Sequence, residues 1–196
     1  LGAQRISPRG ERLWARGESA LPVSDSPTWS ELSPLLLPDG EGGALIVFGW
    51  ENADGAADVM AQRVAPDGRV LWNDGDQAMD VSATTDSERA VAAVPDGHGG
   101  ALVAFELEFL EGEFKGDVDL MAQRIDGDGV RLWNGGQEPS QLAGGKGVER
   151  RPWVISDGAG GMIVAFEYEP LEGEFAGDID MLAQRIDADG KLLWND

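Results

Sequence analysis

Three segments of this chain are apolar at five successive positions: residues 44–48 (ALIVF), 101–105 (ALVAF) and 162–166 (MIVAF). An apolar run without alternation predicts a strand that is covered on both faces. Each run follows a turn rich in Asp and Gly, namely PDGEGG at 38–43, PDGHGG at 95–100 and SDGAGG at 156–161. Such turns predict hairpins, in which each buried strand pairs with a short strand before it. No segment keeps the apolar period of a helix, so no helix is predicted.

The pattern belongs to a longer repeat. The tripeptide Ala-Gln-Arg begins at positions 3, 61, 122 and 183, and a Trp follows each Ala after eleven residues: Trp14, Trp72, Trp133 and Trp194. The spacings between copies are 58, 61 and 61 residues, which predicts one supersecondary unit copied along the chain. Each Ala-Gln-Arg segment is expected to lie in a third strand, and each Trp to end a fourth strand, as at 191–194.

Four antiparallel strands in about 60 residues are typical of β-propeller blades. We therefore predict an all-β chain of about 3.5 four-stranded blades, an incomplete ring. The predicted units are an opening half-blade with third and fourth strands plus a connector at 1–29, and blades at 30–87, 88–148 and 149–196. Unpaired edge strands invite association. We expect the arc to be completed by a longer chain, by further copies of itself or by another protein.

The hairpins that join third and fourth strands resemble a known motif. They read SPRGERLW from Ser7, APDGRVLW from Ala65, DGDGVRLW from Asp126 and DADGKLLW from Asp187. These segments resemble the Asp-box, Ser-x-Asp-x-Gly-x-Thr-Trp, of sialidase-type and BNR-repeat propellers. The Gly comes one place early, Leu replaces Thr, and the first copy has Arg9 in place of Asp. The resemblance implies a propeller in which the box is structural and not catalytic.

Charge narrows the set of partners. Asp and Glu outnumber Lys and Arg by 36 to 15, giving a formal net charge of −21. A field of this sign repels phosphate backbones, so nucleic acid is not expected as a partner. The sequence has no Cys and no apolar run long enough to span a membrane. The acidic surface and the low Lys content fit an extracellular, cell-surface or periplasmic protein.

Two long acidic loops follow the second strands of two repeats. They read ELEFLEGEFKGDVD from Glu106 and EYEPLEGEFAGDID from Glu167, with six carboxylates in each. Hard cations such as Ca²⁺ bind several carboxylate and carbonyl oxygens, so these loops are candidate calcium sites. The alternative is a solvated acidic loop. The candidate ligands are Glu111, Glu113, Asp117, Asp119, Glu172, Glu174, Asp178 and Asp180.

Aromatic side chains lie close to the same loops. They form a candidate surface for a protein partner or a glycan, with interblade core as the alternative. The candidates are Trp50, Phe109, Phe114, Tyr168 and Phe175. The Arg of each Gln-Arg pair is expected to bridge to a carboxylate on a neighbouring second strand, namely Glu51, Glu108 or Glu169.

These observations favour a non-catalytic interaction and assembly module of exported type, stabilised by calcium and not an enzyme. Two alternatives remain. One is a sialidase-like glycosidase or glycan-binding propeller, with Glu106 and Glu108, or Glu167 and Glu169, as catalytic carboxylates. The other is a structural segment of a larger enzyme. Against catalysis, the sequence has one Tyr and one His, and it lacks a nucleophile triad and a phosphate-binding loop.

Overall fold

The computed structural model describes residues 1–75, 77–82 and 84–194. Its regular structure is β-strand, with three 3₁₀ turns in that part of the chain. The first strands are β1 (Gly2–Ala3), β2 (Leu21–Pro22), β3 (Ser30–Pro38), β4 (Ala44–Glu51), β5 (Ala57–Val64) and β6 (Met79–Asp80). Then come β7 (Ser87–Pro95), β8 (Ala101–Glu108), β9 (Val118–Ile125), β10 (Ser140–Ala143), β11 (Gly147–Ser156), β12 (Met162–Pro170) and β13 (Asp180–Ile186). The turns are η1 (Ala15–Gly17), η2 (Trp72–Gly75) and η3 (Trp133–Gly136).

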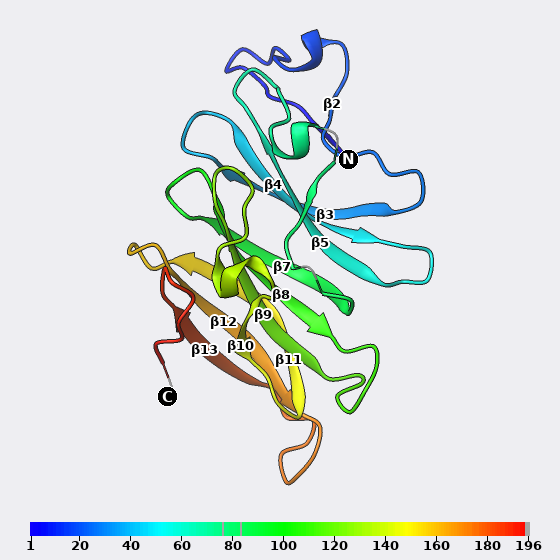
Figure 1. The fold of residues 1–196 in the computed structure, drawn as a ribbon, viewed down its shortest axis with the longest axis vertical. Helices are drawn as coiled ribbons and strands as arrows, with labels where there is room; N and C mark the ends of the chain where they lie inside the picture. The colour runs from blue at the N-terminus through cyan, green and yellow to red at the C-terminus, as the bar shows by residue number, and fades with distance from the viewer. Residues whose placement is uncertain (76, 83, 195–196) are drawn as a thin grey trace.

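The strands form successive antiparallel sheets that correspond to propeller blades. β3 to β6 form one four-stranded blade, β7 to β10 a second, and β11 to β13 a three-stranded one, while β1 pairs with β2. One parallel bridge, Val148 to Val118, joins β11 to β9. In Figure 1 the sheets follow one another along the long axis, from the blue opening segment to the red β13. The predicted all-β, incomplete propeller is confirmed.

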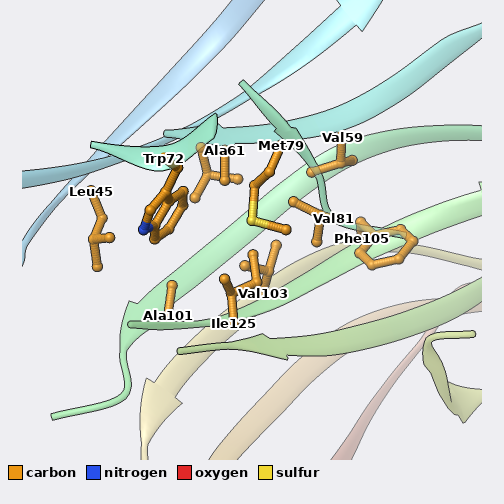
Figure 2. Close-up of a cluster of buried hydrophobic side chains, with 11 residues drawn as sticks. Leu45, Val59, Ala61, Trp72, Met79, Val81, Ala101, Val103, Phe105 and Ile125 are labelled. Carbon is orange, nitrogen blue, oxygen red and sulfur yellow. The ribbon is translucent and has the colours of Figure 1, made fainter. Parts of the chain in front are cut away.

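The central strand of each blade is covered on both faces, as its unbroken apolar run predicts. On β4, Leu45 and Val47 face the second blade, whereas Ile46 and Phe48 face the opening segment. Figure 2 shows the first of these interfaces, in which side chains of the two four-stranded blades interdigitate around Trp72. Full burial of one such aliphatic or aromatic side chain stabilises the fold by about 1.5–3 kcal/mol. The blades therefore depend on one another for their cores.

The outer edge of each blade differs from the prediction. After the Asp-box-like hairpin only one bridge forms, for example Ile186 to Leu192, so residues 191–194 do not make a fourth strand. In the four-stranded blades the chain reverses at left-handed residues, such as Asn73 (φ 50°) and Asp74 (φ 54°). It then returns as β6 or β10, which are the true fourth strands.

A buried Gln holds each of these reversals in place. The side chain of Gln123 accepts from the backbone N–H of Trp133 at 2.9 Å and donates to the carbonyls of Trp133 and Glu138 at 3.4 Å. It also accepts from the N–H of Arg124. The Gln of the repeat thus satisfies backbone groups that the short hairpin leaves unpaired.

The prediction that the repeated Arg pairs with a second-strand Glu is wrong. Arg124 pairs with Asp96, in the turn between the first two strands of its own blade, at 3.0 Å. Its other branch donates to the carbonyl of Ala188, on the next blade. Burial raises the pKa of Asp96, but hydrogen bonds from the N–H groups of His98 and Gly100 and from Arg124 lower it below its usual value overall. The second-strand carboxylate Glu108 cannot pair with Arg124, because it lies at the opposite end of β8, in register with Val118.

Candidate functional site

The inner strands of the blades share an irregularity at one end. The pairing register shifts between Leu32 and Leu35 in β3, and between Arg150 and Trp153 in β11, with an equivalent shift in β7. Ser33 (φ 50°) and Arg151 (φ 53°) lie in the left-handed region at these bulges. Non-glycine residues adopt this region at a cost, and bulges of this kind re-aim side chains and backbone groups near binding sites.

At the bulge of β11, Arg151 joins carboxylates from two neighbouring blades. Its backbone N–H donates to Glu106 Oε1 on β8 at 2.6 Å. Its guanidinium Nη1 donates to both oxygens of Glu167 on β12 at 3.0 Å. Arg150 also pairs with Glu167 at 3.3 Å and with Glu169 at 2.7 Å. The bulge thus gathers two carboxylates around one residue at the end of the inner strand.

The two carboxylates have opposite electrostatic environments. Burial raises the pKa of Glu106, although the N–H of Arg151 and nearby Arg charges oppose the shift. For Glu167, the hydrogen bonds from Arg151 and Arg150 and their positive charges lower the pKa. Glu106 is therefore the one that retains a proton more readily, while Glu167 stays ionised. Paired groups with pKa values pushed apart are the usual arrangement of an acid and a carboxylate in catalysis.

A cavity of about 310 Å³ opens between β3 and β4 of the first four-stranded blade and β7 of the second. Trp50, Glu51, Glu88 and Arg89 are among its lining residues. Arg89 lines the cavity and pairs in register with Glu106 across β7 and β8, and its guanidinium donates to the carbonyl of Gly55. The charge of Arg89 also acts to lower the pKa of Glu106, and we call the cavity together with the Arg151 cluster the axial site.

Two buried polar atoms of cavity-lining residues have no hydrogen-bond partner among the described residues. They are the indole Nε1 of Trp50 and the Oε2 atom of Glu88. Trp50 stacks on Trp29 with ring centroids 4.8 Å apart, which fixes the ring. Glu88 is fully buried, and burial raises its pKa to about 7. Unpaired buried polar groups are rare, and both of these atoms are closed off from solvent.

The predicted metal ligands are not assembled into one site. Asp119 is buried and accepts a 2.5 Å hydrogen bond from Gln141, and burial raises its pKa. Asp117 is partly buried. The remaining candidates are exposed to solvent: Glu111, Glu113, Glu172, Glu174, Asp178 and Asp180. Across residues 1–75, 77–82 and 84–194, no group of three or more His, Asp or Glu is arranged to hold a metal ion. Calcium binding stays a prediction without a built site.

The predicted aromatic surface is divided among several places. Trp50 lines the axial cavity. The ring centroids of Phe109 and Phe114 lie 5.9 Å apart in the first acidic loop. Together with Asp119, these two residues line a separate cavity of about 370 Å³. Tyr168 packs against the core between the last two blades, and Phe175 is exposed at the tip of the second loop. Only Trp50 therefore belongs to the axial site.

Sequence reasoning missed several members of this site, namely Glu88, Arg89, Arg150 and Arg151. A signal was present. A Glu recurs at the start of each inner strand, as Glu31, Glu88 and Glu149, and two of the three are followed by Arg. The bulges that aim these residues have no distinct sequence signature, so their convergence was visible only in the structure.

The comparisons with known proteins concern the fold. No family model matches the sequence, and no curated protein matches it. Among solved structures, a thermostable family-43 glycoside hydrolase matches over 83% of this chain and 53% of its own, with 11% identity and a TM-score of 0.54. The endo-arabinase from Bacteroides thetaiotaomicron matches over 90% and 65%, with 14% identity and a TM-score of 0.54.

An exo-1,5-α-L-arabinanase from a bovine ruminal metagenomic library matches over 95% of this chain and 64% of its own, with 10% identity and a TM-score of 0.54. The fold is a β-propeller. This chain spans less than two thirds of the length of each of these structures. The comparisons support the propeller without showing an Asp-box family. In the part of the chain that the structure describes, no helix is long and apolar enough to cross a membrane.

One functional expectation is corrected by these matches. We expected a non-catalytic interaction module that is not an enzyme. The similar structures are glycoside hydrolases, and this favours the alternative of a glycosidase-like propeller over the interaction module. The carboxylates on the second strands recur in the repeats, and this recurrence favoured a structural role for them.

Proposed function

We propose that this chain contributes to a propeller that binds a glycan at the axial site and hydrolyses its glycosidic bonds. The observation that carries the proposal is the pair Glu106 and Glu167, held through Arg151 and shifted in opposite pKa directions. Two carboxylates with different protonation states are what glycoside hydrolysis requires. The similarity of the fold to glycoside hydrolases supports the same reaction class.

In this proposal Glu106 is the general acid. Its proton passes to the glycosidic oxygen as the bond to the anomeric carbon breaks, which makes the leaving group a neutral alcohol. Glu167 is the ionised carboxylate, and its negative charge stabilises the oxocarbenium-like transition state on the other side of the bond. A water molecule then adds to the anomeric carbon and gives a proton to the Glu106 carboxylate, which restores the acid. Arg150 and Arg151 keep Glu167 charged and hold its orientation.

The axial cavity would hold the sugar. Its volume of about 310 Å³ is at the lower end for ligand pockets, which suits a single sugar unit of a longer chain. Trp50, Glu51 and Arg89 in its wall would contact the sugar. Because two similar structures are arabinanases, we propose an arabinose-containing polysaccharide as the substrate class. Such a polymer is met outside the cytoplasm, so we propose an extracellular, cell-surface or periplasmic location.

The test is hydrolysis of a panel of polysaccharides, including arabinan, followed by the release of reducing sugar. We expect activity in the wild-type chain and a loss of at least about 100-fold in Glu106→Gln and in Glu167→Gln. Glu111→Gln is the matched control, because it removes the same charge from an exposed acidic loop. Activity that is unchanged in both axial variants, or absent on every glycan, would overturn the proposal.

A further inference from the structure

Two cavities in the second four-stranded blade share three lining residues, Phe109, Asp119 and Gln141. The smaller has a volume of about 370 Å³, and Phe114 also lines it. The larger, of about 650 Å³, reaches the segment before β7 and the chain reversal after β9. All lining residues lie between positions 84 and 145, with a blade before them and a blade after them, so neither end of the chain forms a wall. We call the two cavities together the acidic groove.

The acidic groove departs from the repeat. The corresponding cavity in the preceding blade has a volume of only about 170 Å³, and Trp50 and Gln77 are among its lining residues. At the equivalent positions of the second blade, the larger cavity of the groove is lined by Leu107 and Glu138. Leu is smaller than Trp, and Glu brings a negative charge that Gln lacks. The enlarged and acidic groove is therefore a property of one blade and not of the repeated scaffold.

Negative charge in and beside the groove has no cationic partner. Burial, with the charge of Asp117 adding to it, raises the pKa of Asp119, although hydrogen bonds from Gln141 and Gly145 oppose the shift. Burial and then the charge of Asp119 raise the pKa of Glu149 to about 7, and its Oε2 atom has no hydrogen-bond partner among the described residues. In the described part of the chain, no Lys, Arg or His pairs with these three carboxylates, and no Lys or Arg lines either cavity. A cation that enters the groove relieves this repulsion.

The walls of the groove suit an organic cation. The rings of Phe109 and Phe114 lie 5.9 Å apart, and aromatic rings attract an ammonium group and cover an alkyl stem. A hard metal ion needs several oxygens around one point, and no group of three or more His, Asp or Glu among the described residues has that arrangement. Asp119 Oδ2 already accepts from Gln141 at 2.5 Å, which favours the single ammonium of Lys over the two-pronged guanidinium of Arg.

The rim of the groove favours a Lys that belongs to a peptide. The loop between β8 and β9 contributes the two Phe rings, and it also carries Glu111 and Glu113, both exposed, against one Lys. The loop is held to the segment before β7, because the backbone N–H of Leu110 donates to Asp86 Oδ1 at 3.0 Å. Its carboxylates are thus presented beside the groove, where further basic residues of the same segment pair with them. Such charge complementarity steers a basic segment to this face.

We propose that the acidic groove binds a basic peptide segment of a partner protein, with one Lys side chain lying against Phe109 and Phe114 and its ammonium donating to Asp119. Neighbouring basic residues of the segment pair with Glu111 and Glu113 on the rim. The lining residues of the acidic groove and those of the axial site do not overlap, so this binding is separate from the proposed hydrolysis.

Calorimetric titration of the full chain with a short peptide of alternating Gly and Lys tests the proposal. We expect the wild type to bind the peptide, and Asp119→Asn and Phe114→Ala each to bind it at least about 10-fold more weakly. The matched controls are Asp180→Asn and Phe175→Ala, at the exposed equivalent positions 61 residues later. They remove the same charge and the same ring, so they should bind like the wild type and exclude a general attraction to the net charge of −21.

Two further ligands identify what the groove recognises. The same peptide with Nε-acetylated lysines keeps the alkyl stems but loses the charges, so it should not bind. Spermidine carries ammonium groups without a peptide backbone, and it should bind more weakly than the peptide. Circular dichroism confirms that each variant is folded. A wild type that does not bind the peptide, equal losses in the groove variants and their controls, unchanged binding of the acetylated peptide, or spermidine binding as tightly as the peptide would overturn the proposal.

Discussion

Gly129 lies beneath the indole of Trp72, so close that a Cβ on this glycine would be 2.9 Å from the ring. The two residues belong to adjacent blades and are 57 positions apart in the chain. The carbonyl of Gly127, two residues earlier in the same turn, accepts from the Trp72 Nε1 at 3.0 Å. The turn and the ring together fix one blade on the next, which explains why Trp and Gly recur at the same places in the repeat.

Gly129→Ala should destabilise the fold by about 2–4 kcal/mol, since it adds a steric clash at an interface to the strain of a left-handed turn. Gly112→Ala is the control. That glycine has φ 82°, but a Cβ added to it would meet nothing within 4 Å, so only the strain of about 1 kcal/mol applies. Urea unfolding measures both. Equal losses in the two variants would show that the Trp72 contact does not constrain the turn.

Gln123→Leu should cost about 2–4 kcal/mol of stability. The change keeps the volume of this fully buried side chain but leaves the backbone N–H and carbonyl of Trp133 without their partners. Gln137→Leu, at an exposed position in the same reversal, should change stability by less than about 0.5 kcal/mol. If Gln123→Leu is as stable as the wild type, the Gln does not hold the outer edge of the blade.

Glu88 should make the fold less stable as the pH rises. Burial raises its pKa to about 7 from an ordinary value of 4.5, so the folded state binds more protons than the unfolded state between these values. Stability is therefore lost as pH increases through this window. Glu88→Gln should remove this dependence and gain roughly 1–3 kcal/mol on the wild type between pH 4 and pH 8. Thermal melts across that range provide the measurement. Parallel stability curves for the two proteins would contradict it.

Arg151→Gly should shift the acid limb of the pH–rate profile to higher pH. Glycine tolerates φ 53° and keeps the N–H that bonds Glu106, but it removes the guanidinium that keeps Glu167 ionised. The pKa of Glu167 then rises, and a higher pH is needed to ionise it. Arg69→Gly, which removes an exposed Arg from an Asp-box-like turn, should leave the profile unchanged. An acid limb that does not move in Arg151→Gly would exclude Glu167 as the ionised carboxylate.

The repeat, the strands covered on both faces and the propeller class were predictable from the sequence, because these features depend on local periodicity and turn chemistry. Successive residues on β4, such as Leu45 and Ile46, face two different cores, and an unbroken apolar run predicts this burial on both faces. The fourth strand was placed wrongly at 191–194. In the four-stranded blades the chain reverses at a left-handed Asn after the Trp, at Asn73 and Asn134, and the fourth strand follows this reversal.

The axial site was not predictable in the same way. Arg151 reaches Glu106 across 45 residues and a blade boundary, and only the bulge in β11 brings them together. Likewise, Arg124 pairs with Asp96 and not with a second-strand Glu, because the strand register places Arg124 at the end of the sheet where Asp96 lies. The Arg151–Glu106 contact depends on how blades are stacked and the Arg124–Asp96 pair on strand register, and periodicity encodes neither.

The most direct test of the proposed function is a crystal structure of the chain soaked with an arabino-oligosaccharide. We predict a sugar unit in the axial cavity, in contact with Trp50 and Arg89, with the adjacent glycosidic oxygen within hydrogen-bond distance of Glu106. Trp50→Ala, soaked in parallel, should show no sugar. Ligand density only on the acidic loops or in other cavities, or an empty axial cavity at saturating sugar, would contradict the account.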